Sequence, residues 1–155
     1  MNSKALVKHK LQTKQLEKYF SIKRGIGKAP LIVKAVDGVS LTIRQGETLG
    51  LVGESGGGKT TVSRMLLALE KPSGGQVFFD DKDLYSLSKT DLGSFHKTVQ
   101  PVFQNPYSSL NPRMRVKSIV GEPLRALTNM KVNERDTRVI QALETVGLGG
   151  SDAQK

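Results

Sequence analysis

The sequence predicts an α/β fold, because an apolar strand, a glycine-rich loop and an amphipathic helix follow one another without a break. The run Thr48–Val52 is short and apolar, which is typical of a buried parallel strand. The loop Gly53–Thr60 follows it directly. Beyond the loop, four apolar residues recur at the spacing of one helical face: Val62, Met65, Leu66 and Leu69.

The loop fits the pattern G-x-x-x-x-G-K-[ST], whose backbone N–H groups surround phosphate oxygens. Glycines allow the necessary curl, and the following helix adds the positive end of its dipole. We expect Lys59 to reach the β and γ phosphates and the Thr60 hydroxyl to bind Mg²⁺. A flexible surface loop with an incidental lysine is the alternative. The predicted nucleotide-binding residues here are Gly53, Glu54, Ser55, Gly56, Gly57, Gly58, Lys59, Thr60 and Thr61.

Composition narrows the function classes. The 155 residues carry 24 Lys and Arg against 14 Asp and Glu, a net charge of +10, which suits phosphorylated ligands, anionic membranes or nucleic acids. The cations are dispersed and aromatics make up only 5%, so we expect a solvated surface and no nucleic-acid partner. A basic nucleic-acid-binding domain is the alternative, and its affinity would depend steeply on salt. The sequence has no cysteine, which excludes disulfides and thiolate metal sites.

The segment before the loop is predicted to be mostly β structure. A strand is expected over Ala5–Leu11, and the basic segment Ser21–Lys34, which contains glycine and proline, is interpreted as a loop. Alternating apolar residues predict a half-buried strand over Val36–Ile43. Arg44–Glu47 is expected to turn into the strand that leads to the phosphate loop.

The segment after the first helix is predicted to contain further strands and helices. A turn at Lys71–Gly75 precedes a strand over Gln76–Phe79, and Ser88, with Asp91 three residues later, predicts the cap of a helix ending near Lys97. Next come a strand over Thr98–Phe103, weakened by Pro101, and a loop over Gln104–Arg113. A helix is expected over Ser118–Leu127, limited by Pro123. A last helix has Asn133 as its cap and Gly147 as its stop, and its apolar stripe consists of Val139, Ile140, Leu143 and Val146.

Two segments resemble the ATP-binding subunits of ABC transporters. One is Val36–Ser40 together with Gly46–Gly56; the other, Val102–Met114, reads VFQNPYSSLNPRM and is similar to a segment of the oligopeptide, dipeptide and nickel importer ATPases. The resemblance extends from about residue 5 to Leu148. It implies a P-loop NTPase of the ABC ATPase type, with an antiparallel β subdomain, a RecA-like core and the start of a helical subdomain. The expected divisions of this partial domain, 1–155, are 5–52, 53–103 and 104–155.

The resemblance also implies roles for two residues outside the phosphate loop. Gln104 matches the Q-loop glutamine, which ligates Mg²⁺ and lies near the attacking water; an amide oxygen suits the first role. Phe20 matches the aromatic that stacks on adenine just after the first strand, with Tyr19 as its competitor and a core aromatic as the alternative. Pro72–Gln76 resembles the LSGGQ signature, but it precedes the Q-loop and runs into a strand, so we interpret it as a turn.

The resemblance implies cofactors, partners and a location. These are ATP and Mg²⁺, a second ABC ATPase subunit, transmembrane permease subunits and, indirectly, an extracytoplasmic solute-binding protein. The chain would lie at the cytoplasmic face of the plasma (inner) membrane as a peripheral subunit and energise import of peptides or related small solutes.

Several motifs of the family do not occur within residues 1–155. The chain reaches Lys155 before the signature helix is expected, and no later apolar strand ends in Asp-Glu as Walker B would. The switch histidine is also absent, since His9 and His96 both precede the Q-loop. We therefore expect a truncated chain without catalytic residues, which binds Mg-ATP with negligible hydrolysis. The alternative is a non-hydrolysing nucleotide-binding or regulatory fragment; a small-molecule kinase is disfavoured by the Q-loop segment. Without the acidic strand, Leu49 and Leu51 would face an open sheet edge, and we expect marginal stability.

Overall fold

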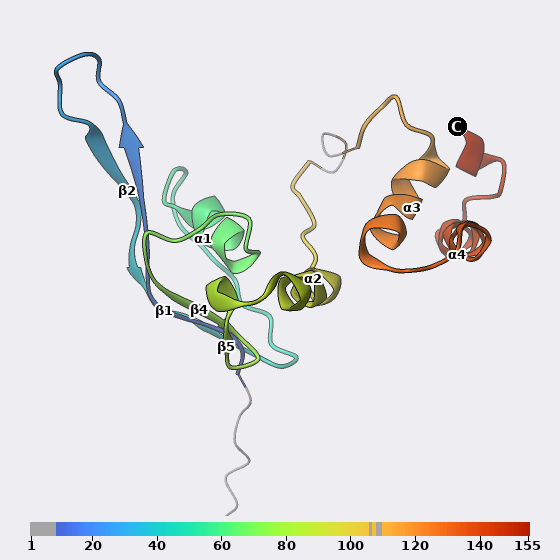
Figure 1. The fold of residues 1–155 in the computed structure, drawn as a ribbon, viewed down its shortest axis with the longest axis horizontal. Coiled ribbons are helices and arrows are strands. Elements are labelled where there is room, and N and C mark those ends of the chain that lie inside the picture. The colour runs from blue at the N-terminus through green and yellow to red at the C-terminus, as the bar shows by residue number, and fades with distance from the viewer. Residues whose placement is uncertain (1–8, 106, 108–109) are drawn as a thin grey trace, which may run out of the picture. The chain divides into compact units, whose positions relative to one another are not determined.

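The computed structural model describes residues 9–105, 107 and 110–155 and has the mixed α/β character that the sequence predicts (Figure 1). The chain divides after Val99 into two compact units, and each has its own apolar core. No helix in the described part of the chain is both long and apolar enough to cross a membrane.

The first unit is built on one five-stranded sheet. Its strands are β1 (His9–Ile22), β2 (Leu31–Val39), β3 (Thr42–Arg44), β4 (Gly74–Phe79) and β5 (Lys82–Asp83). The order is β2-β1-β4-β5, with β3 also paired to β1, and the four pairings among the described strands are all antiparallel. Figure 1 shows β1 and β2 as a long hairpin. The 14-residue β1 therefore organises the sheet, because three other strands pair with it.

The predicted loop over Ser21–Lys34 is wrong at both ends. Strand β1 continues to Ile22 and β2 begins at Leu31, and these two residues face each other across the hairpin. Phe20 and Val33 form a further pair in the same ladder. Aromatic and β-branched residues in register stabilise such pairs, which outweighs the glycine and proline signals nearby. The strand expected over Ala5–Leu11 lies outside the described residues except for its last three positions, which belong to β1.

The predicted continuous strand over Val36–Ile43 is instead divided between β2 and β3. Thr13, which is 2% exposed, occupies the break: its hydroxyl donates to the Val39 carbonyl at 3.0 Å and accepts from the Leu41 amide at 3.0 Å. The Thr13 amide also donates to the Leu41 carbonyl at 2.8 Å. A buried side chain far along the sequence therefore satisfies the backbone where the strand breaks.

The predicted strands over Thr48–Val52 and Thr98–Phe103 are not formed. Residues 48–52 and 99–103 have no strand conformation, and Thr98 ends a helix. Val52 is 94% exposed. An apolar run carries no information about its pairing partner, and a strand requires a neighbour to accept and donate its backbone hydrogen bonds.

Two helices, α1 (Lys59–Leu66) and α2 (Lys89–Thr98), belong to the first unit. Val62 and Met65 of α1 are buried as predicted, but Leu69 lies beyond the helix end and is 48% exposed. Ser88 caps α2 as predicted, since its hydroxyl accepts from the Asp91 amide at 3.1 Å. A single 3₁₀ turn, η1 (Leu84–Ser86), lies between β5 and α2. The core of this unit consists of Leu16, Val36, Val62, Met65, Val77, Leu84 and Phe95.

The strand predicted over Gln76–Phe79 is confirmed as part of β4, which begins two residues earlier, at Gly74. The preceding turn is therefore shorter than predicted. The SGGQ run opens this strand and does not open a helix.

The second unit contains α3 (Val116–Leu127), α4 (Val132–Thr145) and the short 3₁₀ helix η3 (Asp152–Gln154). Its buried core is Val139, Leu143 and Ala153. The predicted cap Asn133 is wrong: Lys131 holds the cap position without a side-chain hydrogen bond, and Asn133 lies inside α4. Val146, expected in the apolar stripe, is 70% exposed.

The predicted stop at Gly147 is confirmed. Gly147 has φ +78°, its amide donates to the Glu144 carbonyl at 3.0 Å, and the Leu148 amide donates to the Leu143 carbonyl at 3.0 Å. This pair of bonds is the Schellman motif, which requires a left-handed residue at this position and ends the helix.

Candidate functional site

The glycine-rich loop Gly53–Gly58 turns back on itself and leads directly into α1. The Gly57 amide donates to the Glu54 carbonyl at 3.1 Å, and the Val62 amide donates to the Gly58 carbonyl at 2.9 Å, which begins the helix. Gly58 is the N-cap residue of α1, and no side chain caps the helix. The first backbone N–H groups of a helix have no acceptor inside it, so these donors are available to a ligand.

Gly58 holds the loop against strand β2. Its φ is +80°, and a Cβ built on it would lie 2.2 Å from the carbonyl oxygen of Ala35. Neither the backbone conformation nor the space admits a side chain at this position. The close approach therefore fixes where the start of α1 lies on the sheet.

A pocket of about 290 Å³ opens at this junction. No acidic side chain lines it. The first turn of α1 also lacks an acidic residue that could neutralise the helix N-terminus. The pocket therefore combines backbone donors, a lysine and two threonine hydroxyls, which suits a phosphate group. Its lining residues are Ala35, Ser55, Gly56, Gly57, Gly58, Lys59, Thr60 and Thr61.

Lys59 spans the mouth of the loop. Its ammonium group donates to the carbonyl oxygens of Gly53 at 2.7 Å and Glu54 at 2.6 Å. Both acceptors are neutral main-chain groups, and no carboxylate among the described residues is paired with this lysine. A phosphate, which carries full negative charge, is the stronger acceptor for an ammonium group. Lys59 can therefore exchange its two carbonyl bonds for phosphate oxygens.

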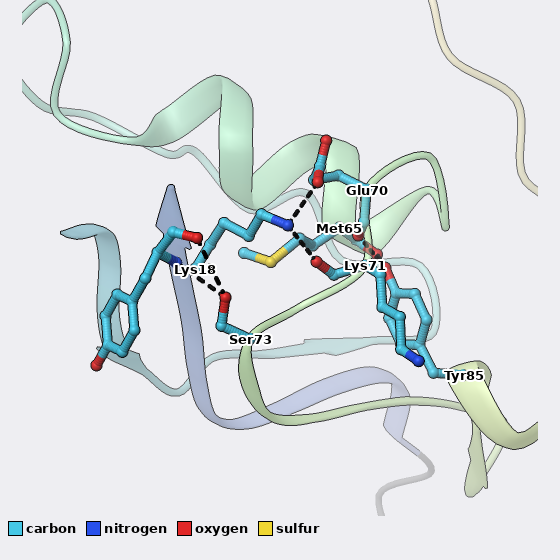
Figure 2. A network of polar contacts seen from close by, with 7 residues as sticks. Lys18, Met65, Glu70, Lys71, Ser73 and Tyr85 are labelled. Carbon is cyan, nitrogen blue, oxygen red and sulfur yellow. Dashed lines mark hydrogen bonds and ion pairs between the residues drawn. The ribbon is translucent and has the colours of Figure 1, made fainter. Parts of the chain in front are cut away.

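A polar network fixes the other end of α1 (Figure 2). The Tyr85 hydroxyl lies 2.7 Å from the Met65 carbonyl oxygen and 2.6 Å from that of Glu70, both acceptors. The Lys18 ammonium group donates to the Lys71 carbonyl at 2.7 Å and forms an ion pair with Glu70 at 2.6 Å. Burial, together with the charge of Glu70, raises the pKa of Tyr85 to about 12, so the hydroxyl stays protonated as a donor.

This network connects β1, the chain after α1 and η1. The hydrogen bond and charge of Lys18 hold the pKa of Glu70 below its ordinary value. In the same region the Ser73 hydroxyl accepts from the Tyr19 amide at 3.0 Å. Since α1 is thereby held at both ends, its N-terminus has a fixed position for a ligand.

The structure gathers most of the predicted phosphate-loop residues at one pocket, from Ser55 to Thr61. Gly53 and Glu54 belong to the site through their carbonyl oxygens, which accept hydrogen bonds from the Lys59 ammonium group. Thr60 is exposed at the start of α1, so its hydroxyl is accessible to a metal ion. Among the described residues no group of three His, Cys, Asp or Glu side chains could hold a metal by itself. A Mg²⁺ ion here would therefore be held with the phosphates, for which a threonine hydroxyl is a suitable ligand.

Phe20 lies within β1, and not just after it, and is 40% exposed. It is therefore not a core aromatic, which removes that alternative. Tyr19, the alternative residue for stacking on adenine, donates a hydrogen bond from its hydroxyl to the Asp37 carboxylate at 2.6 Å. This bond raises the pKa of Tyr19 and lowers the pKa of Asp37. Stacking of Phe20 on adenine stays a prediction.

Gln104 lies in the second unit, in an irregular and exposed segment that follows Val99. Its role at the metal stays a prediction. Residues 106, 108 and 109 of the same segment lie outside the described residues.

Sequence reasoning missed Ala35 and the network around Tyr85. Ala35 lines the pocket because β2 places its carbonyl against Gly58, and no side-chain signal marks such a contact. Lys18, Glu70 and Tyr85 lie far apart in the sequence and are brought together by the folded first unit.

Comparison with known proteins agrees with this geometry. A protein-family model described as ABC transporter matches residues 36–155. The oligopeptide transport ATP-binding protein AppF of Bacillus subtilis (strain 168) is 43% identical over 145 residues, which is 92% of this chain and 44% of AppF. The dipeptide transport ATP-binding protein DppF of Haemophilus influenzae is 41% identical over 133 residues, 86% of this chain and 41% of DppF. The chain thus spans less than half the length of these relatives.

Solved structures show the same fold. A dimeric structure of the ATP-binding cassette MJ0796, in a post-hydrolysis state bound to ADP and Pi, has a TM-score of 0.71 and 26% identity. The match covers 93% of this chain and 60% of that one. The structure of cbiO1 from Clostridium perfringens, part of the transporter complex cbiONQ, has a TM-score of 0.65 and 25% identity over 96% of this chain and 54% of that one.

Proposed function

This chain belongs to the ABC transporter family, and on that premise we propose that it supplies the phosphate-binding part of the ATP site in a subunit that energises solute import. The observation that carries the proposal is the pocket of about 290 Å³ at the uncapped N-terminus of α1, with Lys59 among its lining residues. Relatives that support it are the oligopeptide and dipeptide transport ATP-binding proteins described above. Peptides or related small solutes are therefore the proposed cargo.

The proposed ligand is ATP with Mg²⁺. The backbone of Gly53–Thr61 would surround the phosphates, Lys59 would neutralise the β and γ groups, and Thr60 would ligate the ion together with Gln104. Bound Mg²⁺ supplies positive charge that neutralises the phosphate oxygens. Phe20 is the proposed platform for adenine. The residues of this chain thereby bind and orient the nucleotide.

We propose that the first unit carries the phosphate loop and that the Q-loop segment begins the helical part, within the divisions 5–52, 53–103 and 104–155. A second ATPase subunit and transmembrane permease subunits are the proposed partners, with an extracytoplasmic solute-binding protein acting indirectly. This arrangement places the subunit peripherally at the cytoplasmic face of the plasma (inner) membrane.

Uptake of a labelled dipeptide or short oligopeptide tests the proposal in cells in which these residues form part of a working importer ATPase. The variant Lys59→Ala should lower uptake to the level of cells that lack the protein. The matched control is Lys89→Ala, which removes a lysine at the start of α2 instead of α1. Unchanged uptake in the Lys59→Ala cells would contradict an energising role, and equal loss in both variants would show that the effect is not specific to the phosphate loop.

A further inference from the structure

The second unit contains a larger cavity, of about 610 Å³, between α3, α4 and the η3 segment. Its volume falls within the range of about 300–1,000 Å³ that is usual for small-molecule sites. Four cationic and two acidic side chains line it: Arg115, Lys117, Arg125, Arg135, Glu122 and Asp136. The lining is therefore predominantly positive.

Two of the four cations are neutralised inside the unit. Lys117 forms an ion pair with Asp136 at 2.7 Å, and Arg125 forms one with Glu122 at 2.7 Å. The bond and charge of Arg125 hold the pKa of Glu122 below its ordinary value, and the charge of Arg135 contributes to the same shift. Both acidic side chains of the cavity are thus already engaged.

The other two cations, Arg115 and Arg135, form no ion pair with any carboxylate in the described part of the chain. Arg115 comes from the residue before α3 and Arg135 from α4, so they reach the cavity from different elements. Arg115 occupies the cap position of α3 without forming a side-chain cap bond, so the positive end of that 12-residue helix also faces this region. Gly121 and Val139, both buried, also line the cavity.

We propose that this cavity binds a small anion carrying two phosphate groups, such as a diphosphate. A guanidinium group binds a phosphate through two parallel hydrogen bonds, so two arginines without an ion pair, from different elements, match two phosphate groups. The cavity lies wholly in residues 114–154 and is separate from the phosphate loop, which belongs to the first unit. The site therefore goes beyond the proposed ATP-binding function and does not depend on it.

Equilibrium dialysis with radiolabelled inorganic pyrophosphate tests this site in the full chain. All proteins carry Lys59→Ala, which weakens binding at the phosphate loop. Adding Arg115→Gln and Arg135→Gln should lower the remaining affinity for pyrophosphate about tenfold or more, because both phosphate partners are lost. The charge-matched control adds Lys131→Gln and Arg138→Gln, two exposed cations that do not line the cavity, and should change affinity by less than about twofold.

A second variant is predicted to raise the affinity for pyrophosphate, a change that misfolding would not produce. Glu122→Gln removes a negative charge from the cavity wall and frees Arg125, so affinity for pyrophosphate should rise severalfold. Replacing pyrophosphate with ADP in the same dialysis separates the free anion from a nucleotide diphosphate as the preferred ligand. The proposal is overturned if the Lys59→Ala protein binds no pyrophosphate, if the two double variants lose affinity equally, or if Glu122→Gln weakens binding.

Discussion

The ammonium group of Lys59 lies 2.6 Å from the carbonyl oxygen of Glu54 and donates a hydrogen bond to it. This bond connects the first residue of α1 to the beginning of the loop that precedes the helix. A hydrogen bond from a charged group to a neutral acceptor contributes about 1.5–3 kcal/mol at most. Phosphate oxygens can displace the carbonyl, because they offer the same lysine a charged acceptor. The loop is therefore curled before a ligand arrives, and Lys59 can change acceptors when a phosphate binds.

Gly58→Ala should abolish Mg-ATP binding. The new Cβ would meet the Ala35 carbonyl at 2.2 Å and would hold a side chain at φ +80°, so either the loop or β2 must move. Backbone strain of this kind destabilises by about 1–3 kcal/mol before the clash is counted. Gly50→Ala is the control, since its Cβ meets nothing within 4 Å and its φ is not positive. Isothermal titration with Mg-ATP measures both, and full binding by Gly58→Ala would show that the close approach is unnecessary.

Thr60→Val should remove the effect of Mg²⁺ on nucleotide affinity while leaving metal-free ATP binding nearly unchanged. Valine keeps the shape of threonine but lacks the hydroxyl that would ligate the ion. The measurement compares ATP affinity with Mg²⁺ and with a chelator. Thr60→Ser, which keeps the hydroxyl, should behave like the natural protein. An undiminished Mg²⁺ effect in Thr60→Val would remove Thr60 from the metal site.

Tyr85→Phe should lower the free energy of unfolding of the first unit by about 1–3 kcal/mol, because two main-chain carbonyls lose their shared donor. Urea unfolding followed by circular dichroism measures the change. Tyr107→Phe is the control, since Tyr107 is 84% exposed. Equal stability of the two variants would mean that the hydroxyl does not secure the C-terminal end of α1.

The ion pair of Lys18 and Glu70 should make the α1 region sensitive to acid. Because the folded-state pKa of Glu70 is lowered, the pair stabilises the fold above the ordinary value of 4.5, and this stabilisation is lost as pH falls through the lowered pKa. Hydrogen exchange of the α1 amides should therefore differ between the natural protein and Glu70→Gln at neutral pH, and the difference should shrink below pH 4.5. Glu134→Gln, at an exposed carboxylate outside the first unit, should show no such dependence. A difference that grows as the pH falls would contradict a stabilising role of the ion pair at neutral pH.

Local signals in the sequence predicted the parts of the fold that depend on local chemistry. The cap at Ser88 and the helix stop at Gly147 depend on hydrogen bonds with backbone groups three to five residues away, and both predictions are confirmed. The curl of the phosphate loop is likewise local, since the Gly57 amide donates to the Glu54 carbonyl three residues earlier. The family was predicted from Val36–Ser40, Gly46–Gly56 and Val102–Met114, and the match of the family model to residues 36–155 confirms it.

The errors concern strands, whose partners are distant in the sequence. Thr48–Val52 is apolar enough for a strand but finds no ladder, whereas Leu31 becomes a strand residue because Ile22 lies opposite. The divided strand near Val39 depends on Thr13, about 26 positions earlier. Within the site, Ala35 could not be predicted because it contributes only its backbone. Pairing partners of this kind are absent from a hydrophobic pattern.

The most direct test of the account is the affinity of the chain for Mg-ATP, measured by isothermal titration for the natural protein and for Lys59→Ala. We predict that the natural protein binds and that Lys59→Ala loses about tenfold or more in affinity, since a charged partner of the phosphates is removed. Lys89→Ala, a matched lysine at the start of α2, should bind like the natural protein. Equal affinity of the natural protein and Lys59→Ala would contradict the assignment of the phosphate site to this loop.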